Sequence, residues 1–171
     1  MIERGGTRLA SGMGLREESG CLYENISKCL VVNSPCTNSN NCYAIICRLC
    51  EEQLDLENEI VDIIKNPTSK YIGTSARTLH ARSREHIDLY NAKSANSMLY
   101  KHVTHKHIED VNSEAQTLFR MIQLSSHRTN LNRMAMEAIL IEHSEKETLL
   151  NGKGAWGRTK IIRMQATQNR V

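Results

Sequence analysis

The cysteines Cys47 and Cys50, separated by two residues, are the first feature of the chain that suggests chemistry. A two-residue gap lets both sulfurs reach one metal ion from a tight turn, as in tetrahedral zinc sites. His102 and His107 supply two further ligands, and the 51 residues between Cys50 and His102 are too many for a short DNA-reading finger. Because four protein ligands leave no open position, this set predicts a structural zinc ion.

Two alternatives to this ligand set stay open. The cysteine pair can be a chance occurrence beside solvated histidines, and Cys36 and Cys42 are rival sulfur ligands. All six cysteines lie between residues 21 and 50, and the N-terminus lacks the apolar stretch of a secretory signal. A reducing compartment, nuclear or cytoplasmic rather than secreted, is therefore expected, and clustered cysteines there favour metal over disulfides.

Glu137 lies inside the apolar run MAMEAILI. A carboxylate in such a helix is either on the exposed strip or half-buried, where it needs a charge partner or a metal ion. Arg133, four residues earlier, offers an ordinary ion pair on the helix surface. Taken alone, the ion pair is the simpler interpretation, and a divalent metal ligand is the alternative.

Arg82 and His86 are one helical turn apart beside the apolar face of a predicted helix. Arginine can clamp a phosphate with two hydrogen bonds, and histidine can move a proton near neutral pH. Tyr43 and Tyr71 each lie on a predicted strand. Taken singly, solvated surface explains the first pair and core packing explains either tyrosine.

The elements that must position these residues are predicted from hydrophobic periodicity. Residues 1–40 are expected to be weakly ordered, with the compact part starting near Cys42. Strands are expected at 42–47, at 70–74, where a glycine ends the strand, and at 117–124. Helices are expected within 51–67 (Leu56, Ile60, Ile63 and Ile64, ended by Pro67), at 78–90 capped by Thr78, at 94–107 capped by Ser94, and at 130–144. This order predicts a small α/β domain.

Composition excludes several classes of protein. The 171 residues suit one domain, 40% hydrophobic residues suffice for a core, and no apolar run approaches the roughly 20 residues of a membrane helix. Net charge is +3, but the charges are uneven: six acidic and no basic residues lie in 51–62, and five basic and no acidic residues in 152–171. The basic tail can contact a polyanion or can be a solvated end.

In combination these residues resemble the GIY-YIG endonuclease family. CYAII (42–46) occupies the place of the first motif, KYIGTSARTLHARSREH (70–86) resembles the second motif and its helix, and EAILI (137–141) and LLN (149–151) resemble the glutamate and asparagine motifs. The resemblance implies a GIY-YIG-type domain over 41–165, with about three strands flanked by helices, an acidic helical insertion at 51–68 in the first hairpin, and a basic tail at 166–171.

A narrower resemblance is to the endonuclease domain of Penelope-like retroelements. It rests on the cysteine pair before YIG, the histidines at 102 and 107, and LLNGKGAW. Those domains carry two cysteines and two histidines as zinc ligands, which supports Cys47, Cys50, His102 and His107. The chain lacks the reverse transcriptase that such elements place before this domain, which suggests a fragment or derivative whose reverse transcriptase partner is encoded elsewhere.

The resemblance implies metal-dependent hydrolysis of a DNA phosphodiester, as a nick for retroelement insertion. Glu137 would bind Mg²⁺ or Mn²⁺, and Arg82 would stabilise the charge developing on the phosphate. Tyr43 would deliver or activate water, with Tyr71 and His86 tuning the proton path and Asn151 anchoring the loop or the substrate.

DNA binding is expected from Lys70, Arg77, Lys101 and the basic tail. The chain departs from the family in having Cys42 for the glycine of the first motif and a longer gap between the two tyrosines. Competing interpretations are a catalytically inactive, zinc-stabilised module that binds nucleic acid or protein, a repair or junction-resolving nuclease of the same superfamily, and a secreted disulfide protein.

Overall fold

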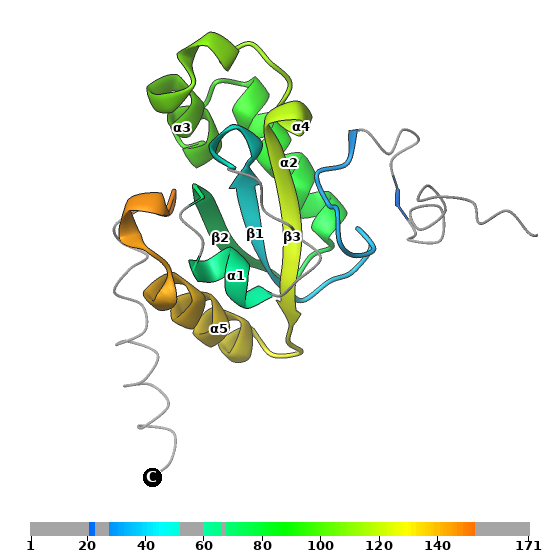
Figure 1. Cartoon of the computed structure of the whole chain (residues 1–171). Coiled ribbons are helices and arrows are strands. Elements are labelled where there is room, and N and C mark those ends of the chain that lie inside the picture. Colours follow the sequence, from blue (N-terminus) through cyan, green and yellow to red (C-terminus); the bar gives the residue numbers. More distant parts are fainter. Residues whose placement is uncertain (1–20, 23–27, 52–59, 66–67, 153–171) are drawn as a thin grey trace, which may run out of the picture.

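The sheet of the computed structural model has three antiparallel strands in the order β2-β1-β3. The structure describes residues 21–22, 28–51, 60–65 and 68–152, and all statements on the fold concern these residues. The strands are β1 (Asn41–Cys47), β2 (Lys70–Ser75) and β3 (Phe119–Ser126), so β1 is central (Figure 1). The small α/β architecture expected from the sequence is therefore confirmed.

Five α-helices accompany the sheet in the described part of the chain. They are α1 (Ile60–Lys65), α2 (Leu79–Asn91), α3 (Met98–Lys106), α4 (Ala115–Leu118) and α5 (Asn130–His143). Short 3₁₀ turns are η3 (Arg48–Cys50), η4 (Ile108–Asp110) and η5 (Lys146–Thr148).

Helix starts follow side-chain caps. Thr78 Oγ1 accepts a hydrogen bond from Ala81 N at 3.2 Å, so the predicted cap of α2 is confirmed. Helix α3 starts later than predicted, because Ser97 rather than Ser94 caps it, with its Oγ accepting from Tyr100 N at 3.1 Å. Strand β2 ends at Ser75, one residue beyond the predicted range of 70–74.

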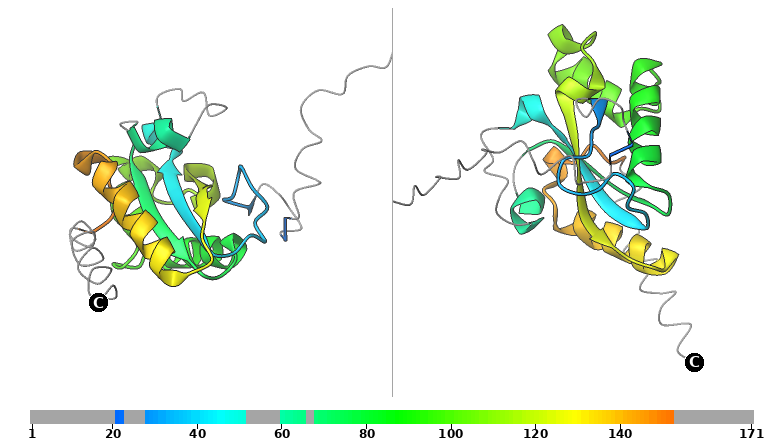
Figure 2. Two further views of the ribbon diagram at one scale, coloured as in Figure 1. Left: turned by 90° about the horizontal axis from the view of Figure 1, so that it is seen from below. Right: turned by 90° about the vertical axis from the view of Figure 1, so that its right-hand side faces the viewer.

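The central strand separates two apolar cores. All seven residues of β1 are buried, and because side chains alternate, Tyr43, Ile45 and Cys47 face one core while Ala44 and Ile46 face the other. The first core is completed by apolar residues of α2, α3 and α4, and the second by residues of α1 and α5. Figures 1 and 2 show these helices on opposite sides of the sheet. The domain is thus a helix–sheet–helix sandwich.

Part of the N-terminal segment belongs to the compact fold, so the prediction that residues 1–40 are weakly ordered is wrong for 29–38. Leu30 is fully buried in the first core. Its carbonyl accepts from Met121 N at 2.7 Å, and Val32 N donates to the Met121 carbonyl at 3.1 Å, so the segment covers the outer edge of β3. The N–H of Leu79 then donates to the Asn38 carbonyl at 2.8 Å, which ties the segment to the start of α2.

Several predicted segments lie partly outside the described residues. In the insertion at 51–68, α1 is described, and its Ile63 and Ile64 are buried in the second core. Leu56 and Pro67, the domain end at 153–165 and the basic tail at 166–171 lie outside the described residues, as do 1–20 and 23–27. Among the described helices, none has the length and apolar character needed to cross a membrane.

Candidate functional site

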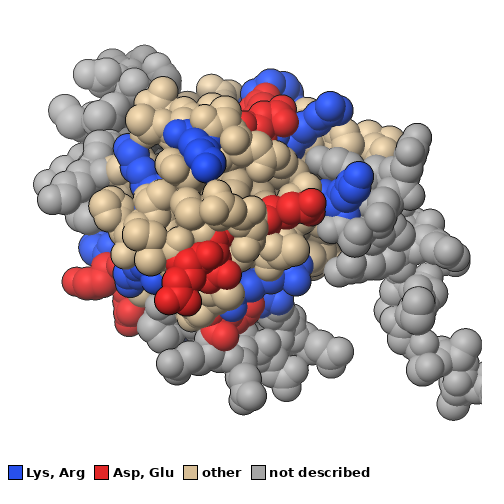
Figure 3. Space-filling view, turned by 90° about the horizontal axis from the view of Figure 1, so that it is seen from above, with Lys and Arg blue, Asp and Glu red and all other residues tan. Residues whose placement is uncertain are grey.

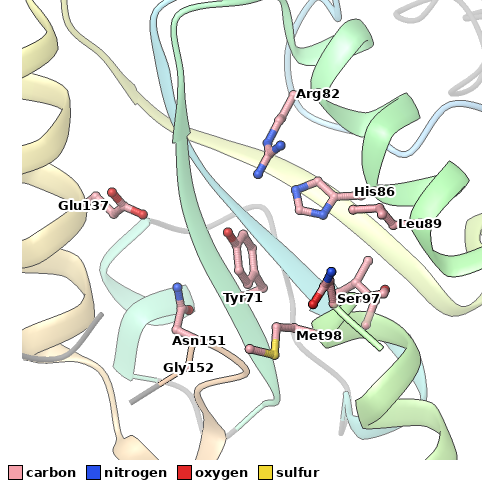
Figure 4. Close-up of a pocket in the computed structure, with 11 residues that line it drawn as sticks. Tyr71, Arg82, His86, Leu89, Ser97, Met98, Glu137, Asn151 and Gly152 are labelled. Atoms are coloured by element: carbon pink, nitrogen blue, oxygen red, sulfur yellow. The ribbon is translucent and has the colours of Figure 1, made fainter. Parts of the chain in front are cut away.

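A cavity of about 440 Å³ opens beside β2, between α2, the start of α3 and α5. Five of the six residues predicted to be catalytic line it: Tyr71, Arg82, His86, Glu137 and Asn151. They come from β2, α2, α5 and the segment after η5, and Figure 4 shows Arg82 and Glu137 reaching toward the cavity from opposite sides of Tyr71. Residues up to 80 positions apart in the sequence therefore share one concave surface.

Tyr43, the sixth predicted residue, lies behind the cavity rather than on its wall. Its side chain is fully buried, and its hydroxyl oxygen accepts a hydrogen bond from Arg82 Nε at 2.7 Å. The same hydroxyl lies 3.0 Å from His86 Nε2. Burial raises the pKa of the Tyr43 hydroxyl above its usual range, so it stays protonated. With Arg82 occupying one lone pair, we assign the hydroxyl proton to the bond with His86.

Arg82 is held on two sides. Besides donating through Nε to Tyr43, it donates through Nη1 to Glu85 Oε2 at 2.6 Å, one turn further along α2. The other oxygen of Glu85 pairs with Arg77. Among the described residues no hydrogen-bond partner contacts Arg82 Nη2, so this nitrogen remains available to a ligand in the cavity.

His86 is neutral in this setting. Burial, reinforced by the positive charge of Arg82, lowers the pKa of its imidazole to about 3. The ring also packs edge-on against Tyr71, with centroids 5.2 Å apart and planes at 65°. An imidazole with so low a pKa is a weak base at neutral pH, which favours a positioning role over proton abstraction.

Gly73 explains why the two tyrosines can lie so close together. It pairs with Tyr43 across β1 and β2, and a Cβ at this position would lie 2.6 Å from the Tyr43 hydroxyl and 2.8 Å from Tyr71 Cε1. Real side chains essentially never approach that closely. The glycine of YIG is therefore required by a close approach, not by a turn.

Glu137 lies on the cavity side of α5 and is only 6% exposed. The Arg133 guanidinium, one turn earlier, donates to Asn40 Oδ1 at 2.8 Å, to the His127 carbonyl and to Asn130 Oδ1 at 3.3 Å each. Arg133 is thus engaged with Asn40, which precedes β1, and with residues around the start of α5. Glu137 is one of the residues that line the cavity. A carboxylate at a polar cavity wall is the ligand type that Mg²⁺ and Mn²⁺ prefer.

Asn151 joins the segment after η5 to the edge of the sheet. Its Oδ1 accepts from Ile72 N at 2.8 Å, and its Nδ2 donates to the Ile72 carbonyl at 2.6 Å. The oxygen and the nitrogen of the side-chain amide are thus both hydrogen-bonded to the backbone of β2. The side chain fixes the cavity wall next to Tyr71, and one N–H and one lone pair of its amide are not used by these two bonds.

A second constellation lies at the other end of β1. The ligand atoms of Cys47, Cys50, His102 and His107 all lie within 4.8 Å of one another. Cys50 Sγ is 3.1 Å from His107 Nε2 and 3.3 Å from His102 Nε2, and Cys47 Sγ is 3.6 Å from His107 Nε2. Ligands at zinc-bond lengths on a tetrahedron are separated by roughly 3.3–3.8 Å. The four residues therefore fit a zinc-like ion.

These four residues, here called the metal group, join η3 to α3 and to His107, the C-cap of α3. Burial, with the charges of His107 and Lys106, lowers the pKa of His102 to about 4, and burial raises the pKa of Cys47 to about 12. The histidine is therefore already neutral, while a bound ion must displace protons from the thiols. His105, on the same helix, is exposed and outside the group. Because Ser97 and Met98 at the start of α3 line the cavity, the ion would also brace the cavity wall.

Three other predicted residues have different outcomes. Lys70 is fully buried, its Nζ donates to the Ile63 carbonyl at 2.9 Å, and burial lowers its pKa to about 8, so the prediction that it binds DNA is wrong. Arg77 and Lys101 are exposed. Figure 3, which looks onto the upper end of the molecule in Figure 1, shows acidic and basic side chains intermixed on that face.

The rival sulfur ligands do not join the metal group. Cys42 Sγ donates to the Arg133 carbonyl at 3.4 Å beside α5, and Cys36 belongs to a different cysteine group. Sequence reasoning also missed Glu85, which holds Arg82. Its signal was the i,i+3 spacing of opposite charges on one helix.

Comparisons with protein-family models, with curated proteins and with solved structures find no match to this chain. What can be stated of its class comes from the geometry: a small α/β domain with a mixed-charge cavity on one side of the sheet and a group of two cysteines and two histidines at the end of β1.

Proposed function

We propose that the chain is a metal-dependent DNA endonuclease of the GIY-YIG type, with the acidic helical insertion in its first hairpin. The observation that carries the proposal is the convergence of Glu137, Arg82, Tyr71 and His86 on one cavity from three separate elements. The carboxylate can bind a metal cation, and the guanidinium opposite it can bind an anion. A phosphodiester held between that cation and the guanidinium would have a positive charge on each side.

In this proposal Glu137 binds one Mg²⁺ or Mn²⁺. The carboxylate fits such a cation because Glu137 is only 6% exposed, lines the cavity and offers oxygen atoms as metal ligands. When bound, the cation supplies Lewis-acid polarisation of a phosphate oxygen. The remaining chemistry belongs to side chains of the chain itself.

Arg82 binds the scissile phosphate through the Nη2 that its protein partners leave available. A water oxygen bonds to phosphorus while one P–O ester bond breaks, the water gives up a proton to solvent in the open cavity, and the leaving oxygen takes up a proton from the same solvent. The guanidinium stabilises the negative charge that grows on the other phosphate oxygens. Because Tyr43 and Glu85 fix the other two guanidinium nitrogens, Arg82 is preorganised for this charge.

Tyr71 supplies the hydroxyl on the cavity wall that orients the attacking water. Tyr43, whose hydroxyl is buried between Arg82 and His86, acts as a positioning residue instead of a water donor. His86, neutral and edge-on to Tyr71, holds both tyrosines in place. This distribution of roles departs from the sequence-based expectation that Tyr43 delivers water.

Along the DNA backbone, the exposed Arg77 and Lys101 and the basic tail are the proposed phosphate contacts. Binding would weaken with salt, because each neutralised phosphate releases counterions. A retroelement origin, with a reverse transcriptase encoded elsewhere as partner, is part of the same proposal and rests on the resemblance of the motifs.

The test is a nicking assay on supercoiled plasmid with Mg²⁺ or Mn²⁺, using the zinc-loaded full chain. We expect Glu137→Gln to abolish metal-dependent nicking and Arg82→Ala to slow it by about 10²-fold or more. Glu142→Gln, an exposed carboxylate on the same helix, is the matched control and should retain the wild-type rate. Circular dichroism would establish that all variants are folded.

If the wild-type protein binds DNA but does not nick it under any of these conditions, the endonuclease proposal is wrong, and the zinc-stabilised binding module becomes the better interpretation. Nicking that survives Glu137→Gln would remove the metal site from the mechanism. Filter binding in EDTA measures the DNA affinity separately, so the two outcomes are distinguishable.

A further inference from the structure

Three cysteines outside the site already described gather at the N-terminal segment. The sulfur atoms of Cys21, Cys29 and Cys36 all lie within 4.8 Å of one another. Cys36 and Cys29 are buried, 2% and 8% exposed, and Cys21 is half-buried. None of the three forms a disulfide in the described part of the chain, and three cysteines cannot pair off as disulfides without leaving one over.

We propose that Cys21, Cys29 and Cys36 form a second metal site, which takes a thiophilic divalent ion such as Zn²⁺. Three sulfurs at this separation occupy three corners of a zinc tetrahedron, and the fourth corner is left to a donor other than these cysteines. Thiolate ligands select zinc and similar soft ions over Mg²⁺ or Ca²⁺. Binding releases the thiol protons, so the ion replaces three S–H groups by three metal–sulfur bonds.

The backbone around the group supports this assignment. Leu22 N donates a hydrogen bond to Cys36 Sγ at 3.2 Å. A backbone N–H aimed at sulfur is the kind of contact that stabilises a bound thiolate and orients it toward its metal ion. The sulfur thus has a donor from the chain in addition to the two neighbouring cysteines.

An ion here would join three parts of the fold. Cys29 precedes Leu30, whose carbonyl accepts from Met121 N on β3, and the Cys36 carbonyl accepts from His80 N at 2.7 Å in the first turn of α2. Arg82 follows two residues after His80 on the same helix. The proposed ion would therefore fix the N-terminal segment to the edge of the sheet and to the start of α2.

The experiment is a metal count on the full chain, purified under reducing conditions with zinc present. Mass spectrometry of the metal is combined with titration of reactive thiols. We expect two zinc ions per chain. Cys21→Ser, the half-buried position, should lower the count to one, as should Cys50→Ser in the other group. Cys42→Ser, a buried cysteine outside both groups, is the matched control and should keep two.

A second readout separates the two sites without relying on a folded variant. Replacement of zinc by Co²⁺ should give thiolate-to-metal absorption from two spectrally distinct ions, one with three sulfurs and one with two. A third readout uses the variant itself: hydrogen exchange at Leu79 N and His80 N should quicken when Cys21→Ser removes the second ion.

A wild-type count of one ion, lost only with Cys50→Ser, would overturn the proposal. So would a disulfide among Cys21, Cys29 and Cys36 in protein purified without reductant from a metal-replete culture, because the thiols would then be consumed by oxidation.

Discussion

Arg82 Nε lies 2.7 Å from the Tyr43 hydroxyl oxygen, which joins the cavity wall on α2 to the buried centre of β1. The tyrosine is fully buried and its hydroxyl also contacts His86 Nε2. One buried hydroxyl therefore fixes two residues of the cavity. Its removal is the most direct way to ask whether the cavity depends on its support from within the sheet.

Tyr43→Phe should destabilise the protein by about 1–3 kcal/mol, because it leaves a half-buried guanidinium nitrogen and a buried imidazole nitrogen without their partner. Urea unfolding measures the free energy. The matched control is Tyr90→Phe. The Tyr90 hydroxyl is buried and makes no hydrogen bond among the described residues, so its removal should cost nothing. Equal losses in both variants would contradict the role given to the Tyr43 hydroxyl.

Gly73→Ala should destabilise the protein by about 1–3 kcal/mol and disturb the cavity, because the new methyl group overlaps Tyr43 and Tyr71. Thermal unfolding and near-UV circular dichroism of the tyrosines measure both effects. Gly152→Ala is the control for stability. Its Cβ would meet only the flexible end of Met98, at 3.3 Å. A Gly73→Ala protein with unchanged stability and tyrosine signal would show that the sheet yields easily here.

The sequence was most informative where a side chain is positioned by its own element. The helical turn between Arg82 and His86 and the Thr78 cap are local features, and both are present in the structure. The tyrosines follow strand alternation in the same way. For such residues, hydrophobic periodicity predicts on which face of its helix or strand a side chain lies. The order of the motifs then suggests that these faces line one site.

The errors concern contacts between distant segments. Lys70 was expected to contact DNA, but its ammonium is buried and donates to the Ile63 carbonyl of α1, which lies in the segment expected to be an acidic insertion. Leu30, Val31 and Val32 form too short an apolar run to predict a strand, and they pair with β3 because it offers an open edge. Neither partner can be read from the local pattern.

Loss of the ion from Cys47, Cys50, His102 and His107 should destabilise the domain. At free zinc about 10³-fold above the dissociation constant, binding adds about 4 kcal/mol to the free energy of unfolding. We expect Cys50→Ala to lower the melting temperature and to abolish its dependence on added zinc at this group. His105→Ala, which changes an exposed histidine of the same helix, should behave as wild type. A melting temperature equally sensitive to both substitutions would argue against these four ligands.

The buried imidazole of His86 should make stability depend on pH. Its pKa is lowered to about 3 in the folded protein, against about 6.5 in the unfolded chain. Between these two pH values the imidazole is protonated in the unfolded chain and neutral in the folded protein. Stability from this residue is therefore complete above about pH 6.5 and falls as the pH drops toward 3, by about 2 kcal/mol at pH 5. Urea unfolding from pH 8 to pH 5 measures it in wild type and in His86→Gln. His102 and His107 are common to both proteins, so the difference between the two pH profiles isolates His86. Parallel profiles would mean that His86 takes up its proton in the folded state and is available as a base, which would reverse the positioning role proposed for it.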